Sequence, residues 1–345
     1  MSEPRQIDVG PGGERAVRAA ELPSRRSDLG RRLGGVAALL GPNVGAVVGF
    51  VLIVVTGTIV SDVFLSGTNI RNVFLQSAML GVVALGMTFV ILTGGIDLSV
   101  GSVLSFCSVV AALLFDNAQG YPLPIVVLAT LALGSAIGAI NGGLIIWRQV
   151  APFIVTLAMM GIALGAGLTI ADGKPIGGIQ GAYAWLGAGR IGNLIPVPVV
   201  IMVVSFVIGA IVLRYTPYGR AVYAVGGNEQ ASRLSGIPVN RVKIITYTFS
   251  GFCAALGAII FSARVTVGDP WAGRGLELDA IAAVVIGGTS LFGGIGSVWG
   301  TFLGTLIIII VNNLLNLMNV SPYTQGIAKG LIILIAIALY RRRAD

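Results

Sequence analysis

Asp97 is the charged residue whose surroundings make it the strongest candidate for chemistry in this sequence. It lies in the run Leu92-Thr93-Gly94-Gly95-Ile96-Asp97-Leu98-Ser99-Val100-Gly101, where paired glycines separate two long apolar stretches. An ionised group inside a membrane is costly and usually faces a cavity or a polar partner. The carboxylate can also cap the following helix by accepting hydrogen bonds from the unpaired amides of Leu98 to Val100. The sequence leaves both roles open, and the two roles are compatible.

The residues around this break form the first set that we expect to shape a functional site. They are Thr93, Gly94, Gly95, Asp97, Ser99 and Gly101. Asn312 and Gln325 are further polar candidates for the same path, because they lie within or beside apolar stretches. Asn141 and Asn313 have the same chemistry, but for them we favour hydrogen bonds between helices.

A partial repeat of this pattern occurs later in the chain. Gly287-Gly288 followed by Gly296-Ser297 resembles Gly94-Gly95 followed by Gly101-Ser102. Glycine interruptions at corresponding places of two halves point to a transport path. The spacing differs between the two pairs, so chance similarity explains the repeat equally well.

A second polar segment, residues 214–243, carries the signals of a short capped helix. Asn228 is a good N-cap, and Glu229 suits the positive start of a helix. Gly236 suits the position just after a helix, where Pro238 then prevents its continuation. The pattern predicts a helix of about two turns outside the membrane.

This helix is either an ordinary surface helix or a rigid element by which a soluble partner moves the membrane helices. We favour the second interpretation, because the segment is capped at both ends and held between two apolar stretches. Its candidate residues are Gly227, Asn228, Glu229, Ala231, Arg233 and Gly236.

The chain lacks the residue types that several kinds of catalytic or cofactor site need. The chain has no histidine, the commonest catalytic base and a common metal ligand. Cys107 and Cys253 each lie in an apolar stretch, so we expect buried thiols without a disulfide or a metal. A phosphate-binding P-loop needs Gly-Lys followed by Ser or Thr, whereas Pro175 follows Gly173-Lys174. We expect no bound cofactor and no ATP on this chain, and no nucleophile or carboxylate pair supports a membrane enzyme.

Membrane-spanning helices are the elements that must hold these residues. Of 345 residues, 55% are hydrophobic and 10% charged, and the mean hydropathy is +0.93. A soluble domain carries about 25% charged residues. The run from Ala280 to Ala328 has no charged residue, although about 20 residues suffice to cross a bilayer. The composition predicts an all-α integral membrane protein of the cell membrane, surrounded by lipid.

The apolar pattern predicts about ten transmembrane helices. They cover Val44–Val60, Phe74–Thr93, Leu98–Phe115, Leu123–Trp147, Val150–Ala171, Leu194–Leu213, Ile244–Ala263, Leu278–Leu291, Gly296–Met318 and Gly326–Tyr340. Residues 44–340 then form the membrane domain, between a basic, disordered tail at 1–43 and a short tail at 341–345. We do not expect a cleavable signal peptide, because no apolar core follows the first few residues.

The distribution of basic residues predicts that both termini are cytoplasmic. With the N-terminus inside, 16 of the 22 Lys and Arg residues lie on the cytoplasmic side and 6 on the other. This asymmetry follows the positive-inside rule. The net charge of +8 is therefore a topology signal, and no nucleic-acid partner is expected.

Four segments resemble the permease subunits of ABC-type monosaccharide transporters, the ribose, xylose and galactose group. The run from Leu92 to Gly101 is similar to the signature of that family, and residues 224–237 resemble the segment that docks on its ATPase. Val150–Leu157 and Gly287–Gly294 also match. The resemblance covers about residues 44–340, and Glu229-Gln230-Ala231 departs modestly from the family's Glu-Ala-Ala.

The resemblance implies a permease that imports a monosaccharide with the help of partners. These are two cytoplasmic ABC ATPase subunits that use ATP, an extracytoplasmic sugar-binding protein, and a second permease copy in a homodimer or pseudo-dimer. The principal alternative is a secondary transporter driven by an ion gradient. It would usually carry several intramembrane charges, whereas Asp97 is the one strong candidate here.

Overall fold

The computed structural model describes residues 44–115, 120–192, 194–321, 324–327 and 330–331. The chain divides into two units, residues 1–44 and 45–345, and the fold set out below is that of the second. The predicted tails at 1–43 and 341–345 lie outside the described residues, as does most of the predicted helix Gly326–Tyr340.

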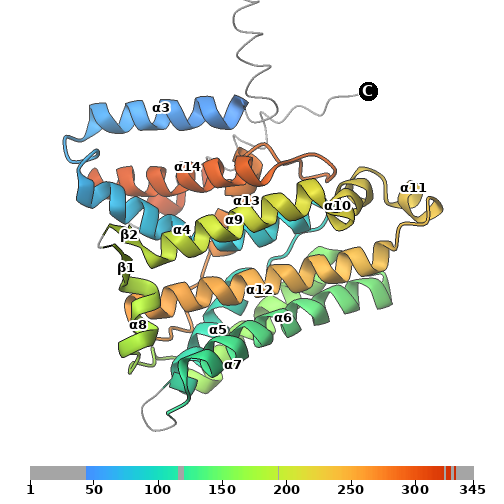
Figure 1. The fold of residues 1–345 in the computed structure, drawn as a ribbon, viewed down its shortest axis with the longest axis horizontal. Coiled ribbons are helices and arrows are strands. Elements are labelled where there is room, and N and C mark those ends of the chain that lie inside the picture. Colours follow the sequence, from blue (N-terminus) through green and yellow to red (C-terminus); the bar gives the residue numbers. More distant parts are fainter. Residues whose placement is uncertain (1–43, 116–119, 193, 322–323, 328–329, 332–345) are drawn as a thin grey trace, which may run out of the picture. The chain divides into compact units, whose positions relative to one another are not determined.

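The described part is built of helices with one short hairpin (Figure 1). The helices are α3 (Val44–Val60), α4 (Gly67–Leu92), α5 (Val100–Phe115), α6 (Leu123–Arg148), α7 (Pro152–Ala171), α8 (Gly181–Ala188), α9 (Val197–Tyr215), α10 (Pro217–Gly227), α11 (Glu229–Leu234), α12 (Val239–Val265), α13 (Leu276–Ile286) and α14 (Val298–Leu317). The antiparallel hairpin pairs β1 (Arg190–Ile191) with β2 (Ile195–Pro196).

Six of the described helices are long and apolar enough to cross a membrane: α4, α6, α7, α9, α12 and α14. The helices α3 and α5 are apolar but shorter. The all-α membrane class predicted from the sequence is therefore confirmed. A count of ten transmembrane helices goes beyond what these helices establish.

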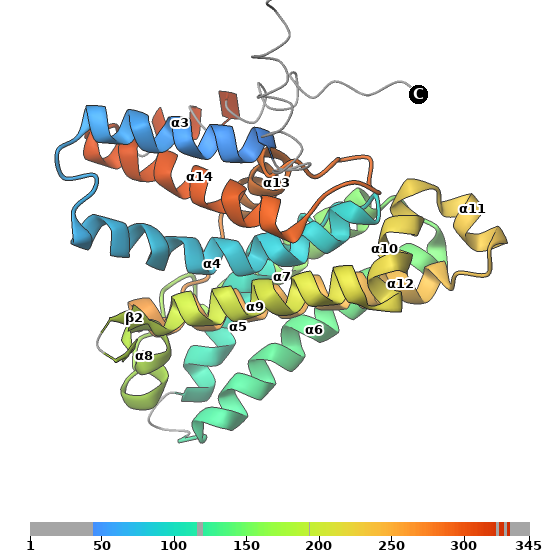
Figure 2. The ribbon, with the colours of Figure 1, turned by 45° about the horizontal axis from the view of Figure 1, so that its top comes forward.

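Helices α4 and α12 form the centre of this unit. Helix α4 packs on α9, α12, α13 and α14, and α12 packs on α4, α5, α6 and α8. Figure 2 shows α4 between α14 and α9, and α12 lies largely behind α9 in that view. Small side chains allow this closeness: a Cβ on Gly86 of α4 would lie 3.0 Å from the Ser250 Cα of α12. Close approach through small residues is how membrane helices associate.

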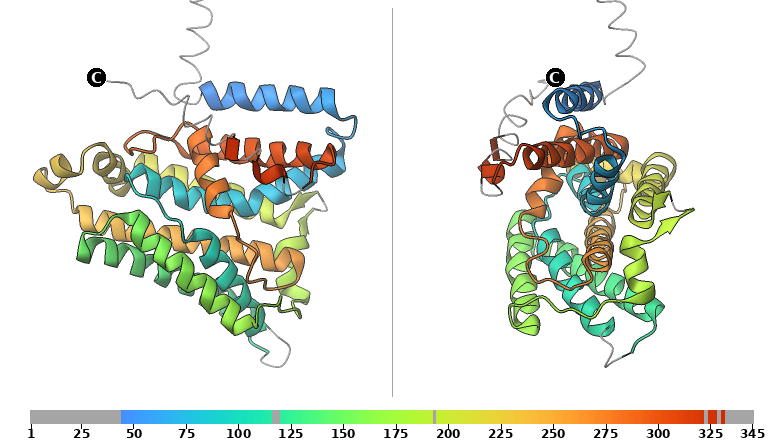
Figure 3. Two further views of the ribbon diagram at one scale, coloured as in Figure 1. Left: turned by 180° about the vertical axis from the view of Figure 1, so that it is seen from behind. Right: turned by 90° about the vertical axis from the view of Figure 1, so that its left-hand side faces the viewer.

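Two short helices, α5 and α13, begin beside each other inside the bundle. A Cβ on Gly101, in the first turn of α5, would lie 2.3 Å from the backbone oxygen of Gly273, just before α13. The Ser105 side chain accepts a 2.8 Å hydrogen bond from the Gly273 amide. Figure 3 shows α5 and α13 among the longer helices from two further directions. Each short helix follows a non-helical segment, residues 93–99 or 266–275.

The helix ends differ from the predicted ones where polar residues continue a helix or glycines stop it. Helix α4 begins at Gly67, earlier than the predicted Phe74, because the Ser66 hydroxyl caps it by accepting from the Asn69 amide at 3.3 Å. Helix α12 begins at Val239, earlier than Ile244, since its first turns are polar. Helix α13 ends at Ile286, because Gly287 and Gly288 follow.

The short capped helix predicted within residues 214–243 is present as α11, and a further helix that was not predicted precedes it. Two helices, α10 and α11, lie there, and the ends of the segment belong to α9 and α12. Thr216 caps α10 by accepting from the Gly219 amide at 3.1 Å, with Pro217 in its first turn. The pattern of Thr followed by Pro was a start signal that the prediction did not use.

Candidate functional site

The Asp97 break begins where α4 ends. Thr93 is the C-cap, and its hydroxyl donates to the Val90 carbonyl at 2.8 Å. Gly94 follows with φ +76°, a conformation that is nearly free for glycine and strained for other residues. The chain then runs non-helically through residues 95–99 until α5 starts at Val100.

Asp97 is 1% exposed, and hydrogen bonds satisfy both of its carboxylate oxygens. Its Oδ1 accepts from the Ser99 amide at 3.0 Å and from the Ser99 hydroxyl at 2.6 Å. Its Oδ2 accepts from the Ser250 hydroxyl of α12 at 2.8 Å. The carboxylate therefore holds the start of α5 and also ties this start to α12.

Two further helices close the site around Asp97. Asn141 of α6 donates to the Ser99 hydroxyl oxygen at 3.0 Å. The backbone oxygen of Ile96 accepts from Thr156 of α7 at 3.4 Å and from Tyr247 of α12 at 3.5 Å. All four of Asn141, Thr156, Ser250 and Tyr247 are buried. The break is thus linked to α6, α7 and α12 through polar side chains.

A row of glycines places α6 and α12 close enough for these contacts. Gly134, Gly138 and Gly142 recur every fourth residue, on one face of α6. A Cβ on Gly138 would lie 2.1 Å from the Tyr247 backbone oxygen, and one on Gly134 would lie 2.4 Å from that of Gly251. The backbones therefore touch where Asn141 and Ser250 meet the break.

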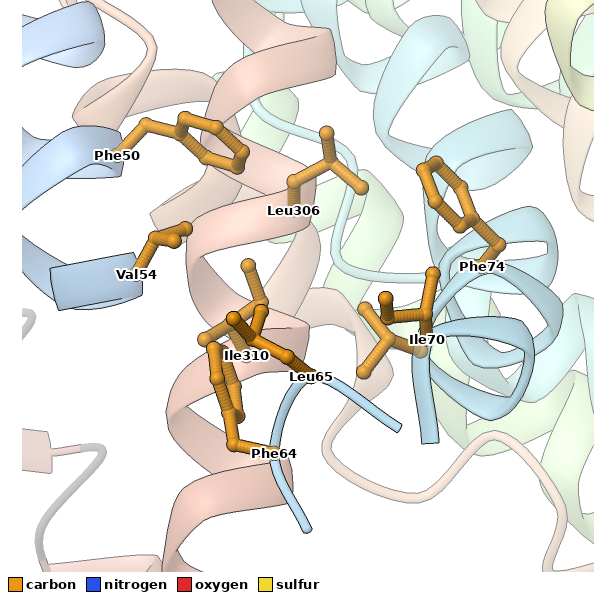
Figure 4. Close-up of a pocket in the computed structure, with 9 residues that line it drawn as sticks. Phe50, Val54, Phe64, Leu65, Ile70, Phe74, Leu306 and Ile310 are labelled. Carbon is orange, nitrogen blue, oxygen red and sulfur yellow. The ribbon is translucent and has the colours of Figure 1, made fainter. Parts of the chain in front are cut away.

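The fully partnered carboxylate makes this cluster a brace rather than an open binding pocket. The apolar pocket of Figure 4 lies elsewhere, between α3, the start of α4 and α14. Its volume is about 130 Å³, and side chains such as Phe50, Phe64 and Ile310 line it without any polar group. A sugar, whose hydroxyl groups need hydrogen-bonding partners, does not fit that lining.

A second glycine break, residues 287–297, lies against the first. The Gly294 amide donates to the Leu92 carbonyl, the last residue of α4, at 3.0 Å. A Cβ on Gly226 of α10 would lie 1.7 Å from the same carbonyl oxygen. The Tyr223 hydroxyl of α10 donates to the Gly296 carbonyl at 3.0 Å. Helix α10 therefore contacts both breaks through its backbone and one hydroxyl group.

Helix α11 has the caps that the sequence predicts. The Asn228 side chain accepts from the Ala231 amide at 2.9 Å, and Gly236 has φ +80° after the helix ends. The Ile237 amide donates to the Ser232 carbonyl at 3.0 Å, which completes a Schellman-type end.

Glu229 connects α11 to the long helix α12. Its carboxylate pairs with Arg233 at 2.8 Å and with Lys243 of α12 at 2.5 Å. Burial alone would raise the pKa of Glu229, but the bonds and charges of Lys243 and Arg233 outweigh it and hold the pKa below its usual range. The carboxylate therefore stays ionised near neutral pH.

The sequence did not reveal two contributors to the Asp97 cluster, nor the high exposure of Leu234. Ser250 and Tyr247 are ordinary helix residues in the sequence, and only the packing of α12 on the break brings them to Asp97. Leu234 is 91% exposed at the end of α11. Leu234 is thus an exposed apolar residue within a charged segment.

Asn312 and Gln325 lie apart from the Asp97 cluster. The Asn313 and Asn69 side chains bond each other at 2.8 and 3.0 Å, which places this part of α14 at the first turn of α4. Gln325 donates to Asn316 at 2.8 Å, beyond Asn313 along α14. The Asp97 break follows the last turn of α4, about 35 Å from Asn69 at 1.5 Å per residue.

Among the described residues, no group of three or more Cys, Asp or Glu side chains could hold a metal ion. Cys107 and Cys253 are free and buried. Asp97 itself binds three hydroxyl or amide donors, which leaves it with the role of an acceptor for protein groups.

Comparison with known proteins identifies relatives over most of the chain. The sequence profile described as "Branched-chain amino acid transport system / permease component" matches residues 69–337. The ribose import permease protein RbsC of Bacillus subtilis is 45% identical over 311 residues, which cover 90% of this chain and 95% of that protein. RbsC of Escherichia coli K12 is 44% identical over 85% of this chain and 91% of its own length. The xylose transport system permease protein XylH of Haemophilus influenzae is 34% identical over 79% and 89%.

No solved structure matches the chain. The profile covers far more than half of the sequence, and it includes both glycine breaks and the α10–α11 segment. The chain therefore belongs to the family of membrane permease components of binding-protein-dependent transport systems.

Proposed function

We propose that this chain is the membrane-spanning permease subunit of an ATP-driven importer of a monosaccharide of the ribose or xylose class. One geometric observation carries the proposal: the α10–α11 segment contacts both glycine breaks, at Leu92 and at Gly294 to Gly296. The relatives named ribose and xylose permeases support the sugar class.

In this proposal the α10–α11 segment, which we term the coupling segment (residues 217–234), receives force from a cytoplasmic ATPase. Gly227, Asn228, Glu229, Ala231, Arg233 and Gly236 form or cap its docking end. The Glu229–Lys243 ion pair transmits movement of α11 to α12. Ser250 lies seven residues after Lys243, about two helical turns, and bonds Asp97. A push on α11 then shifts α12 against the start of α5.

The break residues Thr93, Gly94, Gly95, Asp97, Ser99 and Gly101 shape the transport path in this account by setting the position of α5. Asn312 and Gln325 would serve its opposite end. The path itself forms against a second permease copy, because the Asp97 cluster is closed within one chain. The remaining parts are both termini on the cytoplasmic side, ten transmembrane helices, two ATPase subunits and an extracytoplasmic sugar-binding protein.

A secondary transporter driven by an ion gradient is the weaker alternative. Proton or cation coupling needs an intramembrane group that exchanges its ion during transport. Asp97 has three donors from Ser99 and Ser250 on its two oxygens, and its 1% exposure leaves no open route to it.

Purification from the native membrane tests the proposal. A tagged permease should carry two ATPase subunits through affinity and size-exclusion steps, and ribose-loaded binding protein should stimulate their hydrolysis of ATP. The same measurement of ATP hydrolysis is repeated with xylose and with branched-chain amino acids, each presented by its own binding protein. The compounds that stimulate hydrolysis define the substrate class. A permease that purifies alone and accumulates sugar along an ion gradient without ATP would contradict the proposal.

A further inference from the structure

Three arginines from three different elements line one pocket of about 210 Å³. They are Arg71 in the second turn of α4, Arg190 of β1 and Arg264 in the last turn of α12, with Leu75 and Pro196 between them. No acidic side chain lines this pocket. Among the described residues none of the three forms an ion pair, and the buried Nε of Arg71 has no hydrogen-bond partner. Three guanidinium groups without an acidic partner around one pocket favour a bound anion, and their planar geometry suits a phosphate.

An apolar pocket of about 350 Å³ adjoins this basic one and shares Arg71 and Pro196 with it. Ile70, Phe74 and Leu194 are among its lining residues, and these side chains are 40%, 37% and 83% exposed. Ile70 and Phe74 also line the apolar pocket of Figure 4. The first turns of α4 therefore carry neighbouring apolar pockets beside the three arginines, and we term this apolar surface the trough.

The position along the helices fits the headgroup level of a membrane. The pocket gathers residues near the ends of two membrane-crossing helices, the start of α4 and the end of α12. Polar lipid headgroups lie where spanning helices end, and basic side chains attract anionic ones there. A free anion would fill only the basic pocket and leave the trough empty.

We propose that this composite site binds an anionic phospholipid, with its phosphate among Arg71, Arg190 and Arg264 and its acyl chains along the trough. The lipid belongs to the leaflet opposite the coupling segment. This leaflet is the outer one if the coupling segment is cytoplasmic, and that assignment alone rests on the proposed function. Lipid binding itself needs neither ATP nor sugar.

Native mass spectrometry of the detergent-purified full chain tests the site with phosphatidylglycerol and with phosphatidylcholine of identical acyl chains. The wild type should bind phosphatidylglycerol at least tenfold more tightly. Arg190→Gln and Arg264→Gln should each weaken that binding about fivefold, the effect of one basic residue near an anionic lipid. Arg190 is exposed, so its replacement leaves the core intact. Arg148→Gln, a control at the far end of α6 where the guanidinium covers Trp147, should change nothing.

Four outcomes would overturn the proposal. Equal affinity for the two lipids, or unchanged phosphatidylglycerol binding in both variants, would show that the pocket is no lipid site. Complete displacement of the lipid by millimolar inorganic phosphate would identify a free anion as the ligand. Loss of stimulation by the binding protein in the variants, with lipid affinity unchanged, would assign the arginines to an acidic protein partner. None of these outcomes alters the result of the purification test for the importer.

Discussion

At the scale of single residues, Asp97 has the capping role that its sequence context allowed, together with a polar partner on a second helix. Its carboxylate caps the start of α5 through Ser99 and also crosses to Ser250 on α12. A buried carboxylate is tolerated only when hydrogen bonds replace its water. The residue is thus a joint between the start of α5 and α12.

Removal of one partner tests this joint. Ser250→Ala leaves Oδ2 of Asp97 buried without a donor, which should destabilise the protein by about 1–3 kcal/mol. The thermal midpoint of the purified protein should fall, and uptake should fall with it. Asp97→Asn combined with Ser250→Ala should cost less than the sum of the single changes, since the two groups act on each other.

The matched control is Thr248→Ala, because the Thr248 hydroxyl bonds only back to the Ile244 carbonyl of its own helix at 2.8 Å. It should leave the midpoint and uptake near the wild-type values. Equal losses in the Thr248 and Ser250 variants would mean that the link to Asp97 has no special weight.

Gly95 offers a second test, with a built-in rescue. A Cβ at this position would lie 2.4 Å from the Tyr247 hydroxyl oxygen. Gly95→Ala should therefore displace the break and reduce uptake severalfold, whereas Gly95→Ala with Tyr247→Phe should recover most of it, since the clashing atom is gone. Labelled-sugar uptake in cells measures both variants.

Gly94→Ala is the comparison for that rescue. Gly94 has φ +76°, so its replacement costs about 1 kcal/mol or more in backbone strain. Tyr247→Phe should not relieve it. If Tyr247→Phe rescued neither glycine variant or both of them equally, the clash at Gly95 would not be the cause.

The sequence predicted the residues of the break but not their partners. Gly94-Gly95, Asp97 and Ser99 are neighbours in the chain, so their chemistry is visible in the sequence. Ser250 is 153 residues away from Asp97, and no local pattern distinguishes it from other serines of α12. Asn141 was expected to bond between helices, and it does so with Ser99.

At the scale of elements, helix α10 is the part of the coupling segment that contacts the membrane helix α4. Its last two residues, Gly226 and Gly227, differ in how closely other atoms approach them. A Cβ on Gly226 would lie 1.7 Å from the Leu92 carbonyl oxygen, whereas a Cβ on Gly227 would meet no atom within 4 Å. Backbone contact at Gly226 is possible only without a side chain.

This difference gives a matched pair of variants. Gly226→Ala should separate α10 from the end of α4 and lower sugar-stimulated ATP hydrolysis by tenfold or more. Gly227→Ala should keep hydrolysis within about twofold of the wild type. Both variants should still carry the ATPase through purification. Equal hydrolysis in the two would show that contact at Leu92 does not transmit coupling.

Leu234 is the sharpest probe of the docking end. Glu229→Arg would also break the internal pairs with Arg233 and Lys243, so its effect would be ambiguous. Leu234 is 91% exposed, and its burial in a partner's groove would contribute about 2 kcal/mol, or about thirtyfold in affinity.

Leu234→Asp should therefore weaken ATPase binding about thirtyfold or more without changing the thermal midpoint of the permease. Leu234→Met, which keeps an apolar side chain of similar size, should bind nearly as well as the wild type. Affinity is measured by titration of purified ATPase onto reconstituted permease. Undiminished binding by the Asp variant would place the docking contact elsewhere.

Hydropathy predicted most elements well and failed where a helix is polar. The limits of α3 match the predicted Val44–Val60, and α7 ends at the predicted Ala171. Helix α10 was missed because Arg220 and its glycines weaken the apolar signal. The α5 and α13 helices look like complete spans in the sequence, although each is a short helix after a non-helical segment.

At the scale of the whole molecule, the coupling segment and the three-arginine pocket lie at opposite ends of α12. The chain enters α12 beside α11 and leaves it at Arg264 beside α8 (Figure 1). Composition and charge distribution predicted the membrane class without any contact information, because they depend on the bilayer as solvent. Which helix packs on which could not be predicted, since all of them present similar small and apolar side chains.

In the proposed function, ATP hydrolysed by a partner drives sugar through this permease. Uptake of labelled ribose should be measured in proteoliposomes that hold the permease with its ATPase, with loaded binding protein outside and ATP trapped inside. We expect accumulation that requires ATP, persists when ionophores abolish all ion gradients, and falls at least tenfold with Gly226→Ala but not with Gly227→Ala. Accumulation without ATP that ionophores abolish would contradict it.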